Sequence, residues 1–173
     1  NQFAYRKAHG ARDALAFYLL SWIASLNAGF KMSIYCSDVS GAFDRVSADI
    51  LMRKLESMGL HRRMLGVLRS WLRDRPAYVV VAGKRSKQMS LSNTVFQGTV
   101  WGPTLWNAFF GDALRVLERD GYIVVAYADD YNAFKEHRRS LSNAIILSSL
   151  QSAQETLHQW GRANCVIFDA GKK

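Results

Sequence analysis

Hydrophobic and polar positions recur with two different periods along the chain, and these periods predict its elements. Apolar residues return every three to four positions, as in amphipathic helices, around residues 15–26, 48–58, 61–72 and 141–160. In the first of these helices, the spacing of Leu15, Leu19, Trp22 and Leu26 predicts the buried face. Another helix is expected from Pro103, a residue suited to the first helical turn, to about Arg119. Short apolar runs between turn residues predict strands at residues 31–37, 78–81, 88–91, 122–126, 131–134 and 166–168.

The order of these elements predicts an α+β fold. From residue 31 it is strand, two helices, hairpin, helix, two strands in a hairpin, helix and strand. Without residues 60–96, the remainder is a split βαββαβ unit. In that topology, the strand ending at Asp38 lies beside the hairpin that carries Asp129 and Asp130. Three carboxylates are therefore expected at one end of a sheet.

The segment Tyr127-Ala128-Asp129-Asp130 has two readings. Taken alone, it is typical of a hairpin turn, because aspartate suits turns. Together with Asp38 it predicts a metal site, because clustered carboxylates repel one another unless a cation neutralises them. Hard oxygen ligands suit Mg²⁺, which completes its shell with water and phosphate oxygens. Two such ions can support an in-line displacement at phosphorus.

Composition adds a polyanionic partner to this picture. The 173 residues are 49% hydrophobic, enough for a core, and carry a formal net charge of +9. Such a surplus indicates nucleic acid first and an anionic membrane second. The basic loop 82–86 between two predicted strands has two explanations, a nucleic-acid contact or a charged edge that discourages aggregation. We expect no membrane span and no signal peptide, because no apolar run is long enough and the first residues do not fit.

Two further features concern the chain as a whole. Cys36 and Cys165 each lie in an apolar segment, which predicts reduced core residues of an intracellular protein. The chain starts without Met inside a motif and stops just after a predicted strand. We therefore expect an excerpt of a longer protein.

Several short motifs occur in an order and spacing that resemble a known family. They are Gln2-Phe3-Ala4-Tyr5-Arg6-Lys7, Asp38-Val39-Ser40-Gly41-Ala42-Phe43-Asp44, Gln97-Gly98 with Gly102-Pro103, Tyr127-Ala128-Asp129-Asp130, and Phe168-Asp169-Ala170-Gly171-Lys172. The ordered set resembles the fingers and palm of a reverse transcriptase and is most similar to those of non-LTR retrotransposons. Each motif is weak alone, but the resemblance covers almost the whole chain.

The resemblance implies an architecture. The expected fold is an α+β polymerase palm, a ferredoxin-like or RRM-like split βαββαβ sheet with helices on one face, plus partial fingers and no thumb. Residues 1–30 would be partial fingers and 31–59 the first part of the palm. Residues 60–96 would be a helix and hairpin insertion on the fingers side, and 97–173 the second part of the palm, truncated before the thumb.

The resemblance also implies a reaction. It is RNA-templated DNA synthesis by transfer from deoxynucleoside triphosphates to a primer 3′-hydroxyl, within a larger retrotransposon polyprotein. Asp38 and Asp129 would bind two Mg²⁺ ions, with Mn²⁺ as a substitute, and Asp130 would support them. Lys172 would assist the leaving pyrophosphate, with Lys173 as a rival for that role. The expected partners are an RNA template, a DNA primer, deoxynucleotides and further domains of the same polyprotein, but no membrane.

The family's binding positions carry over in two sets. Those near the incoming nucleotide are Val39, Phe43, Gln97 and Gly98, and those near nucleic acid are Arg6, Lys7 and Tyr127. Phe43 matches the aromatic steric gate that leaves no room for a ribose 2′-hydroxyl. The role of Asp44 stays open, because a carboxylate at a helix start explains it equally well. Asp169 departs from the family, in which Asn is frequent at this position.

Two alternative functions remain. A viral RNA-dependent RNA polymerase shares the palm, but it usually has Gly before the paired aspartates and a small polar residue in place of Phe43. A catalytically silent palm, retained for nucleic-acid binding or assembly, is favoured less because all three carboxylates survive. A eukaryotic retrotransposon origin would imply action in the nucleus.

Overall fold

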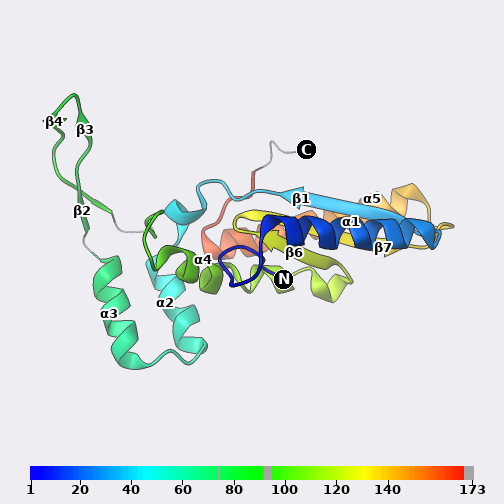
Figure 1. Cartoon of the computed structure of the whole chain (residues 1–173), viewed down its shortest axis with the longest axis horizontal. Coiled ribbons are helices and arrows are strands. Elements are labelled where there is room, and N and C mark those ends of the chain that lie inside the picture. The colour runs from blue at the N-terminus through cyan, green and yellow to red at the C-terminus, as the bar shows by residue number, and fades with distance from the viewer. Residues whose placement is uncertain (74, 92–94, 170–173) are drawn as a thin grey trace. The chain divides into compact units, whose positions relative to one another are not determined.

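The computed structural model of the chain describes residues 1–73, 75–91 and 95–169, and Figure 1 shows their elements. The chain divides into two units. Unit 1 comprises Asn1–Ser40 and Phe110–Lys173, and unit 2 comprises Gly41–Phe109. The α+β class expected from the sequence is confirmed.

Unit 1 is built on a three-stranded antiparallel sheet. Its strands are β1 (Lys31–Ser37), β6 (Ile123–Tyr127) and β7 (Asp130–His137), and β7 lies in the centre. These strands confirm the predicted strand before Asp38 and the predicted hairpin at the paired aspartates. At the free edge of β6, Gln2 forms a parallel bridge with Ala126, so the first residues of the chain extend the sheet.

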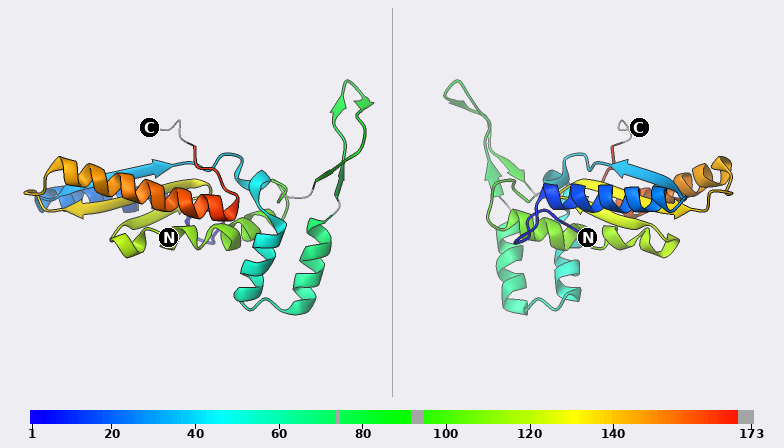
Figure 2. Two further views of the ribbon diagram at one scale, coloured as in Figure 1. Left: turned by 180° about the vertical axis from the view of Figure 1, so that it is seen from behind. Right: turned by 45° about the vertical axis from the view of Figure 1, so that its right-hand side comes forward.

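Helices cover both faces of this sheet. Val125 and Phe134 form a buried cluster with Ala14 of α1 (Ala11–Asn27). The neighbouring Val124 is also fully buried, although its side chain points to the other face. Figure 2 shows α1 on one side of the sheet and α5 (Asn143–Asn164) on the other. The expectation of helices on one face is therefore wrong for α1, because consecutive buried residues in β6 need cover on both sides.

The inward face of helix α1 matches the expected one only at Trp22, which packs partly buried against the core cluster. Three leucines predicted to be buried are 44–59% exposed, namely Leu15, Leu19 and Leu26. Ala14 and Ser25 are buried instead, and Tyr18 packs beside them against the core cluster. The Ser25 hydroxyl is satisfied by the Ser21 carbonyl at 2.8 Å and by Glu136. Small residues let the helix approach the sheet closely, which outweighs the larger hydrophobicity of leucine at this contact.

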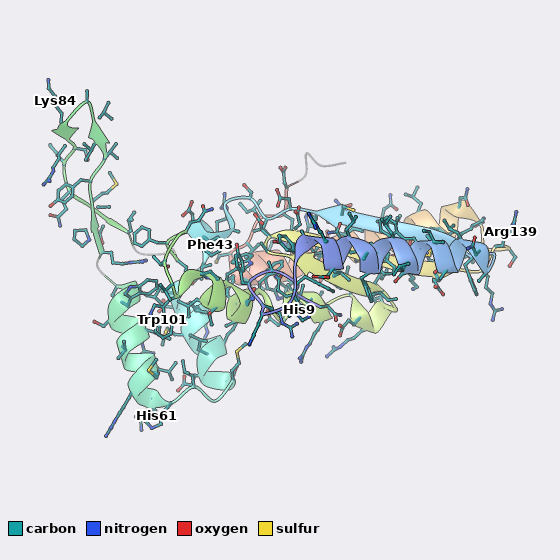
Figure 3. The ribbon with its side chains drawn as sticks, in the orientation of Figure 1. His9, Phe43, His61, Lys84, Trp101 and Arg139 are labelled. Carbon is teal, nitrogen blue, oxygen red and sulfur yellow. The ribbon has the colours of Figure 1, made fainter. Side chains whose placement is uncertain are left out.

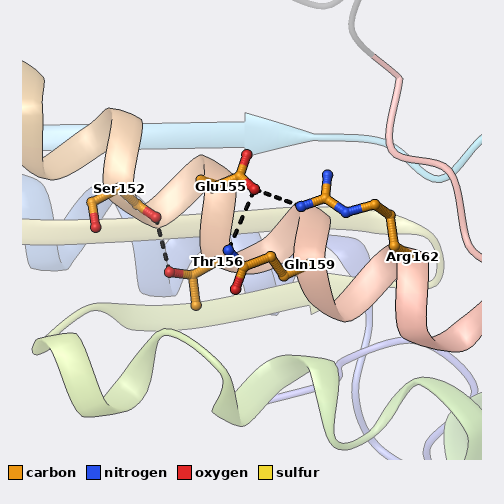
Figure 4. Close-up of polar contacts among 5 residues, drawn as sticks. All are labelled: Ser152, Glu155, Thr156, Gln159 and Arg162. Carbon is orange, nitrogen blue, oxygen red and sulfur yellow. Dashed lines mark hydrogen bonds and ion pairs between the residues drawn. The ribbon is translucent and has the colours of Figure 1, made fainter.

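The helix α5 confirms the amphipathic helix predicted around residues 141–160. Ala153 and Leu157 are 1% and 0% exposed. On its solvent side, Arg162 Nη2 lies 2.5 Å from a Glu155 carboxylate oxygen, and Gln159 donates to the same oxygen (Figure 4). The Arg162 hydrogen bond lowers the pKa of Glu155. Both charged side chains are well exposed, so the pair adds little to stability.

The last predicted strand, residues 166–168, is reduced to a single bridge. Val39 and Phe168 pair antiparallel. The Ser40 N–H donates to the Ile167 carbonyl at 2.9 Å, and the Asp169 N–H donates to the Asp38 carbonyl at 2.8 Å. The segment therefore lies beside the chain just after β1, where the split topology places a fourth strand.

Unit 2 contains helices and two short ladders. Its helices are the 3₁₀ helix η1 (Ala42–Arg45), α2 (Ala48–Ser57), α3 (Arg62–Leu72) and α4 (Gly102–Phe110), whose last residue falls in unit 1. Its strands are β2 (Arg75–Ala77), β3 (Val80–Val81), β4 (Lys84–Arg85) and β5 (Met89–Leu91), paired β2–β5 and β3–β4. The Ser47 side chain caps α2 by accepting from the Ile50 N–H at 3.4 Å.

Three expectations about the chain are settled here. The helix from Pro103 ends at Phe110, and two 3₁₀ turns follow it, η2 (Ala113–Arg115) and η3 (Glu118–Asp120). Gly111 and Asp112 explain this, because both residues disfavour a helix interior. Cys36 and Cys165 are free but exposed, so their predicted core position is wrong. Among the described residues, no helix is long and apolar enough to cross a membrane.

Candidate active site

The turn between β6 and β7 carries the paired aspartates. Tyr127 is the last residue of β6 and pairs with Asp130, the first of β7, so Ala128 and Asp129 form a two-residue loop. Ala128 adopts a left-handed backbone with φ 57°. The strands before and after the turn are buried at Val125, Ala126 and Tyr131. Buried residues of both strands therefore support the turn.

Asp38 reaches the same end of the sheet through the register of β1. The last pair of this ladder is Ser37 with Tyr131, so the next position along β1 aligns Asp38 with Asp130. Side chains alternate along a strand, which puts Asp38 and Asp130 on the face of Cys36. In agreement, partial burial and, to a smaller extent, the Asp130 charge raise the pKa of the Cys36 thiol. The backbone thus confirms that Asp38 lies beside the hairpin of Asp129 and Asp130.

The two aspartates of the turn have different surroundings. Burial, and then the Asp129 charge, raises the pKa of Tyr5, which places Tyr5 near Asp129. Asp130 is exposed, whereas Asp129 is half-buried. Asp169 adds a fourth acidic residue, because its backbone is bonded to that of Asp38. The sequence pattern did not predict that Tyr5 and Asp169 lie near these positions.

The donor set fits a hard divalent cation. Asp38, Asp129 and Asp130 offer only carboxylate oxygens, the ligands that Mg²⁺ prefers. Over residues 1–73, 75–91 and 95–169, however, no three His, Cys, Asp or Glu side chains gather closely enough to hold a metal ion. The structure therefore brings the backbones of the three aspartates together without assembling a ligand cluster.

The first residues of the chain lie along this site. Arg6 Nη1 donates to the Gln2 carbonyl at 3.2 Å, and Gln2 is paired with β6. Lys7 is exposed, and its carbonyl contacts the His9 ring at 2.9 Å. Tyr127 is 37% exposed beside the turn. The three positions expected to contact nucleic acid, Arg6, Lys7 and Tyr127, thus belong to unit 1 together with the aspartates.

Phe43 and the Gln97-Gly98 loop come together within unit 2. The Val95 N–H donates to the Phe43 carbonyl at 2.9 Å, which ties η1 to the chain just before Gln97. The half-buried Phe43 ring lies 5.6 Å from the Trp106 ring of α4 at an interplanar angle of 32°. Figure 3 labels Phe43 and Trp101 on this unit. Phe43 is therefore fixed by packing while part of its ring stays accessible.

The loop at Gln97 and Gly98 is exposed but ordered locally. Gly98 has φ 85°, a conformation that suits glycine, and a Cβ there would meet no atom within 4 Å. The Thr99 hydroxyl donates to the Phe96 carbonyl at 2.8 Å and accepts from the Gly102 N–H at 3.1 Å. Arg75 lies over the Phe96 ring, 4.4 Å from its centroid. The sequence pattern did not predict that Arg75 packs on the ring next to Gln97.

Two remaining positions have different outcomes. Val39 is 2% exposed and paired with Phe168, so its side chain belongs to the core, and a nucleotide contact at Val39 stays a prediction. Lys172 and its rival Lys173 lie outside the described residues, and so do Ala170 and Gly171.

Comparison with known proteins supports the motif-based resemblance. The family described as "Reverse transcriptase (RNA-dependent DNA polymerase)" matches residues 1–172. The "RNA-directed DNA polymerase from mobile element jockey" of Drosophila melanogaster is 27% identical over 99% of this chain and 19% of its own length. The "Retrovirus-related Pol polyprotein from type-1 retrotransposable element R1" of Bradysia coprophila is 28% identical over 78% of this chain and 13% of its own length. The chain thus spans about a fifth or less of these curated relatives.

Solved structures agree with the fold. Telomerase from Candida albicans, solved with the TWJ fragment of telomeric RNA, superimposes with a TM-score of 0.68 over 95% of this chain and 30% of its own, at 18% identity. Telomerase from Candida tropicalis gives a TM-score of 0.65 over 94% of this chain and 34% of its own, at 13% identity. The matched family covers nearly every residue of the chain. The chain therefore belongs to the reverse transcriptase (RNA-dependent DNA polymerase) family, as a domain of the kind found in non-LTR retrotransposons.

Proposed function

We propose that this chain carries the catalytic centre of an enzyme that copies RNA into DNA by adding deoxynucleotides to a primer 3′-hydroxyl. The observation that supports the proposal most directly is the register of β1 against β7. It aligns Asp38 with Asp130, next to Asp129 in the turn, although 91 positions of the sequence separate Asp38 from Asp129. A purely structural hairpin has no need of a third acidic residue at its base.

The three aspartates have distinct roles in this proposal. Asp38 and Asp129 would hold two Mg²⁺ ions, and Asp130 would support them from the start of β7. Bound Mg²⁺ activates the attacking hydroxyl and stabilises the leaving pyrophosphate. Without a cation, mutual repulsion favours separated carboxylate side chains, which agrees with their dispersed arrangement in the described structure.

The residues expected near the incoming nucleotide would select and orient it. The Phe43 ring, held by Trp106, would occupy the space that a ribose 2′-hydroxyl needs. Gln97 and Gly98 would lie along the template and the incoming nucleotide, because both are exposed on a locally braced loop. Val39 would contribute its backbone to the same nucleotide, and Lys172 would neutralise or protonate the pyrophosphate.

The basic surplus would hold the nucleic acid. The formal net charge of +9 favours a polyanion through release of counterions. Arg6 and Lys7 would contact the RNA template or the triphosphate, and Tyr127 would lie near the primer end. We further propose that the chain acts within a larger retrotransposon polyprotein, in the nucleus of a eukaryotic host.

Primer extension by the intact natural polypeptide tests the proposal. We expect Mg²⁺-dependent extension of a DNA primer on an RNA template with deoxynucleotides, and Mn²⁺ should replace Mg²⁺. Extension with ribonucleotides alone would support an RNA-dependent RNA polymerase instead. Absence of both reactions, in a preparation that binds RNA, would contradict the enzymatic proposal.

A thermal shift separates an enzyme from a catalytically silent palm. A ligand that binds only the folded state stabilises it by mass action. We therefore expect Mg²⁺ to raise the Tm of the wild-type chain and to have no such effect on Asp38→Asn. Equal responses of the two proteins would show that Asp38 holds no ion.

A further inference from the structure

The backbone of Ala128 is the strained point of the turn that carries Asp129. Its φ of 57° lies in the left-handed region, which residues with a Cβ adopt at a cost. Such a conformation persists only where the surrounding structure holds it. Only Ala128 and Asp129 lie between Tyr127 and Asp130, the last pair of the ladder.

The side-chain amide of Gln2 forms hydrogen bonds with both the carbonyl and the N–H of Ala128. Its Nε2 donates to the Ala128 carbonyl at 3.0 Å, and its Oε1 accepts from the Ala128 N–H at 2.9 Å. The same Oε1 accepts from the Ala4 N–H at 3.0 Å. Gln2 is 8% exposed, so water competes little for these bonds. A primary amide suits this position because it offers a donor and an acceptor in one plane.

The backbone of Gln2 is itself attached to the hairpin. It forms a parallel bridge with Ala126. The Phe3 N–H donates to the Ala126 carbonyl, and the Ala126 N–H donates to the Asn1 carbonyl, both at 2.9 Å. The amide is therefore fixed two residues before the strained position, on the strand that leads into the turn.

We propose that Gln2 is a positioning residue for the polymerase reaction: its amide fixes the left-handed Ala128 and thereby sets the place of the Asp129 carboxylate. This inference rests on the proposed function. It gives the first residues of the chain a role in the geometry of the catalytic carboxylates, in addition to the nucleic-acid contacts proposed for Arg6 and Lys7.

Substitutions at Gln2 test the role in the intact natural polypeptide. Gln2→Ala removes the amide, and we expect kcat for primer extension to fall about 10- to 100-fold, with a smaller change in the KM for deoxynucleotides. Gln2→Glu keeps the shape but loses the donor to the Ala128 carbonyl, so its loss of kcat should be similar or smaller. The matched control is Asn1→Ala, which removes a neighbouring amide whose Nδ2 donates to Glu118 Oε1 at 3.3 Å, and it should retain activity.

Rescue by glycine distinguishes positioning from general stability. Glycine adopts φ 57° without the cost of a Cβ. The double variant with Gln2→Ala and Ala128→Gly should therefore have a kcat at least about threefold higher than that of Gln2→Ala alone. A merely structural role of Gln2 predicts no such recovery at a temperature at which both variants are folded. Equal kcat for Gln2→Ala and for the double variant would overturn the proposal.

Hydrogen exchange at the Ala128 amide gives an independent readout. The amide should exchange slowly in the wild type and much faster in Gln2→Ala and Gln2→Asn, whether or not the protein is an active polymerase. An unchanged exchange rate of the Ala128 amide in these variants would show that the Gln2 side chain does not hydrogen-bond to it. Faster exchange with kcat within twofold of wild type would overturn the positioning role. If the wild type is inactive, the proposed function fails, and the positioning role built on it fails too, even if exchange confirms the contact.

Discussion

The chain contains two hairpins whose turns share a left-handed alanine, and different features stabilise that alanine in each. Both have two-residue loops that begin with a left-handed alanine, Ala128 with φ 57° and Ala82 with φ 48°. In the β3–β4 hairpin, Gly83 follows with φ 78°, so the turn is satisfied by its own sequence. In the β6–β7 hairpin, Asp129 follows instead, and the amide of the distant Gln2 holds the turn.

The two hairpins also differ in how far their strands are buried. Val124 and Val125 of β6 are 0% and 1% exposed, whereas Val80 and Val81 of β3 are 61% and 68% exposed. A buried hairpin can place a short aspartate side chain to within a fraction of an ångström, as a catalytic site requires. An exposed hairpin that carries Lys84 and Arg85 can supply charge, but not fixed geometry. If the proposed roles hold, the buried hairpin positions the carboxylates and the exposed hairpin supplies charge.

The largest expected effect tests the buried hairpin. Asp129→Asn should lower the primer-extension rate on the order of 10³-fold or more, because a metal ligand stabilises the transition state by several kcal/mol. Asp130→Asn should lose less, because Asp130 is expected only to support the ions. The matched control is Asp120→Asn, an exposed aspartate of η3. Full activity of Asp129→Asn would remove the metal assignment.

The next effect concerns Phe43, whose ring in unit 2 packs against Trp106. Phe43→Val should raise the use of ribonucleotides relative to deoxynucleotides by about 10- to 100-fold, as a ratio of kcat/KM values. Phe43→Tyr is the control, because it keeps the ring against Trp106. An unchanged ratio in Phe43→Val would mean that Phe43 is only a core residue.

A matched pair of substitutions measures the difference between the hairpins directly. Val124→Ala should lower the free energy of unfolding by about 2 kcal/mol, because it removes two fully buried methyl groups and leaves a cavity. Val81→Ala should change it by less than about 0.5 kcal/mol, because Val81 is 68% exposed. Chemical denaturation of both variants checks the difference, and equal losses would contradict the division between a buried and an exposed hairpin.

Much of the fold could be predicted because it depends on local pattern. The strand β1 occupies residues 31–37 as expected, and α3 lies within the predicted range 61–72. The inward face of α1 could not be predicted, because hydrophobic spacing favoured Leu15 and Leu19 while the sheet selects Ala14 through close approach. Periodicity reports that a helix is amphipathic, but not which residues fit the partner surface.

The candidate site shows the same limit. Motif order predicted Asp38, Asp129 and Asp130, and the register of the sheet aligns Asp38 with Asp130, next to the turn that carries Asp129. The contact between Gln2 and Ala128 spans 126 positions, and no local pattern encodes it. Asp169 departs from the family motif, yet its backbone N–H donates a hydrogen bond to the Asp38 carbonyl. Contacts between distant segments become visible only in three dimensions.

The smallest expected effect decides what the exposed hairpin does. From Pro76 to Leu91 the chain carries Lys84, Arg85 and Lys87 but no acidic residue, and Figure 3 labels Lys84 on this hairpin. If these cations contact nucleic acid, replacing all three with Gln should weaken RNA binding about tenfold at moderate salt. The slope of log K against log salt should fall by about 2, or roughly 0.7 per lost phosphate contact with a single strand.

The control for this experiment removes the same charge from another face of unit 2. Arg62, Arg63 and Arg69 are exposed on α3, so their replacement with Gln lowers the net charge equally. If both triple variants lose the same affinity, the hairpin acts only through the charge of the whole molecule. If the hairpin variant keeps its affinity but aggregates, Lys84, Arg85 and Lys87 protect exposed strand edges. A smaller salt slope in the hairpin variant alone would assign it to the nucleic acid, and the two hairpins would then divide attraction from positioning.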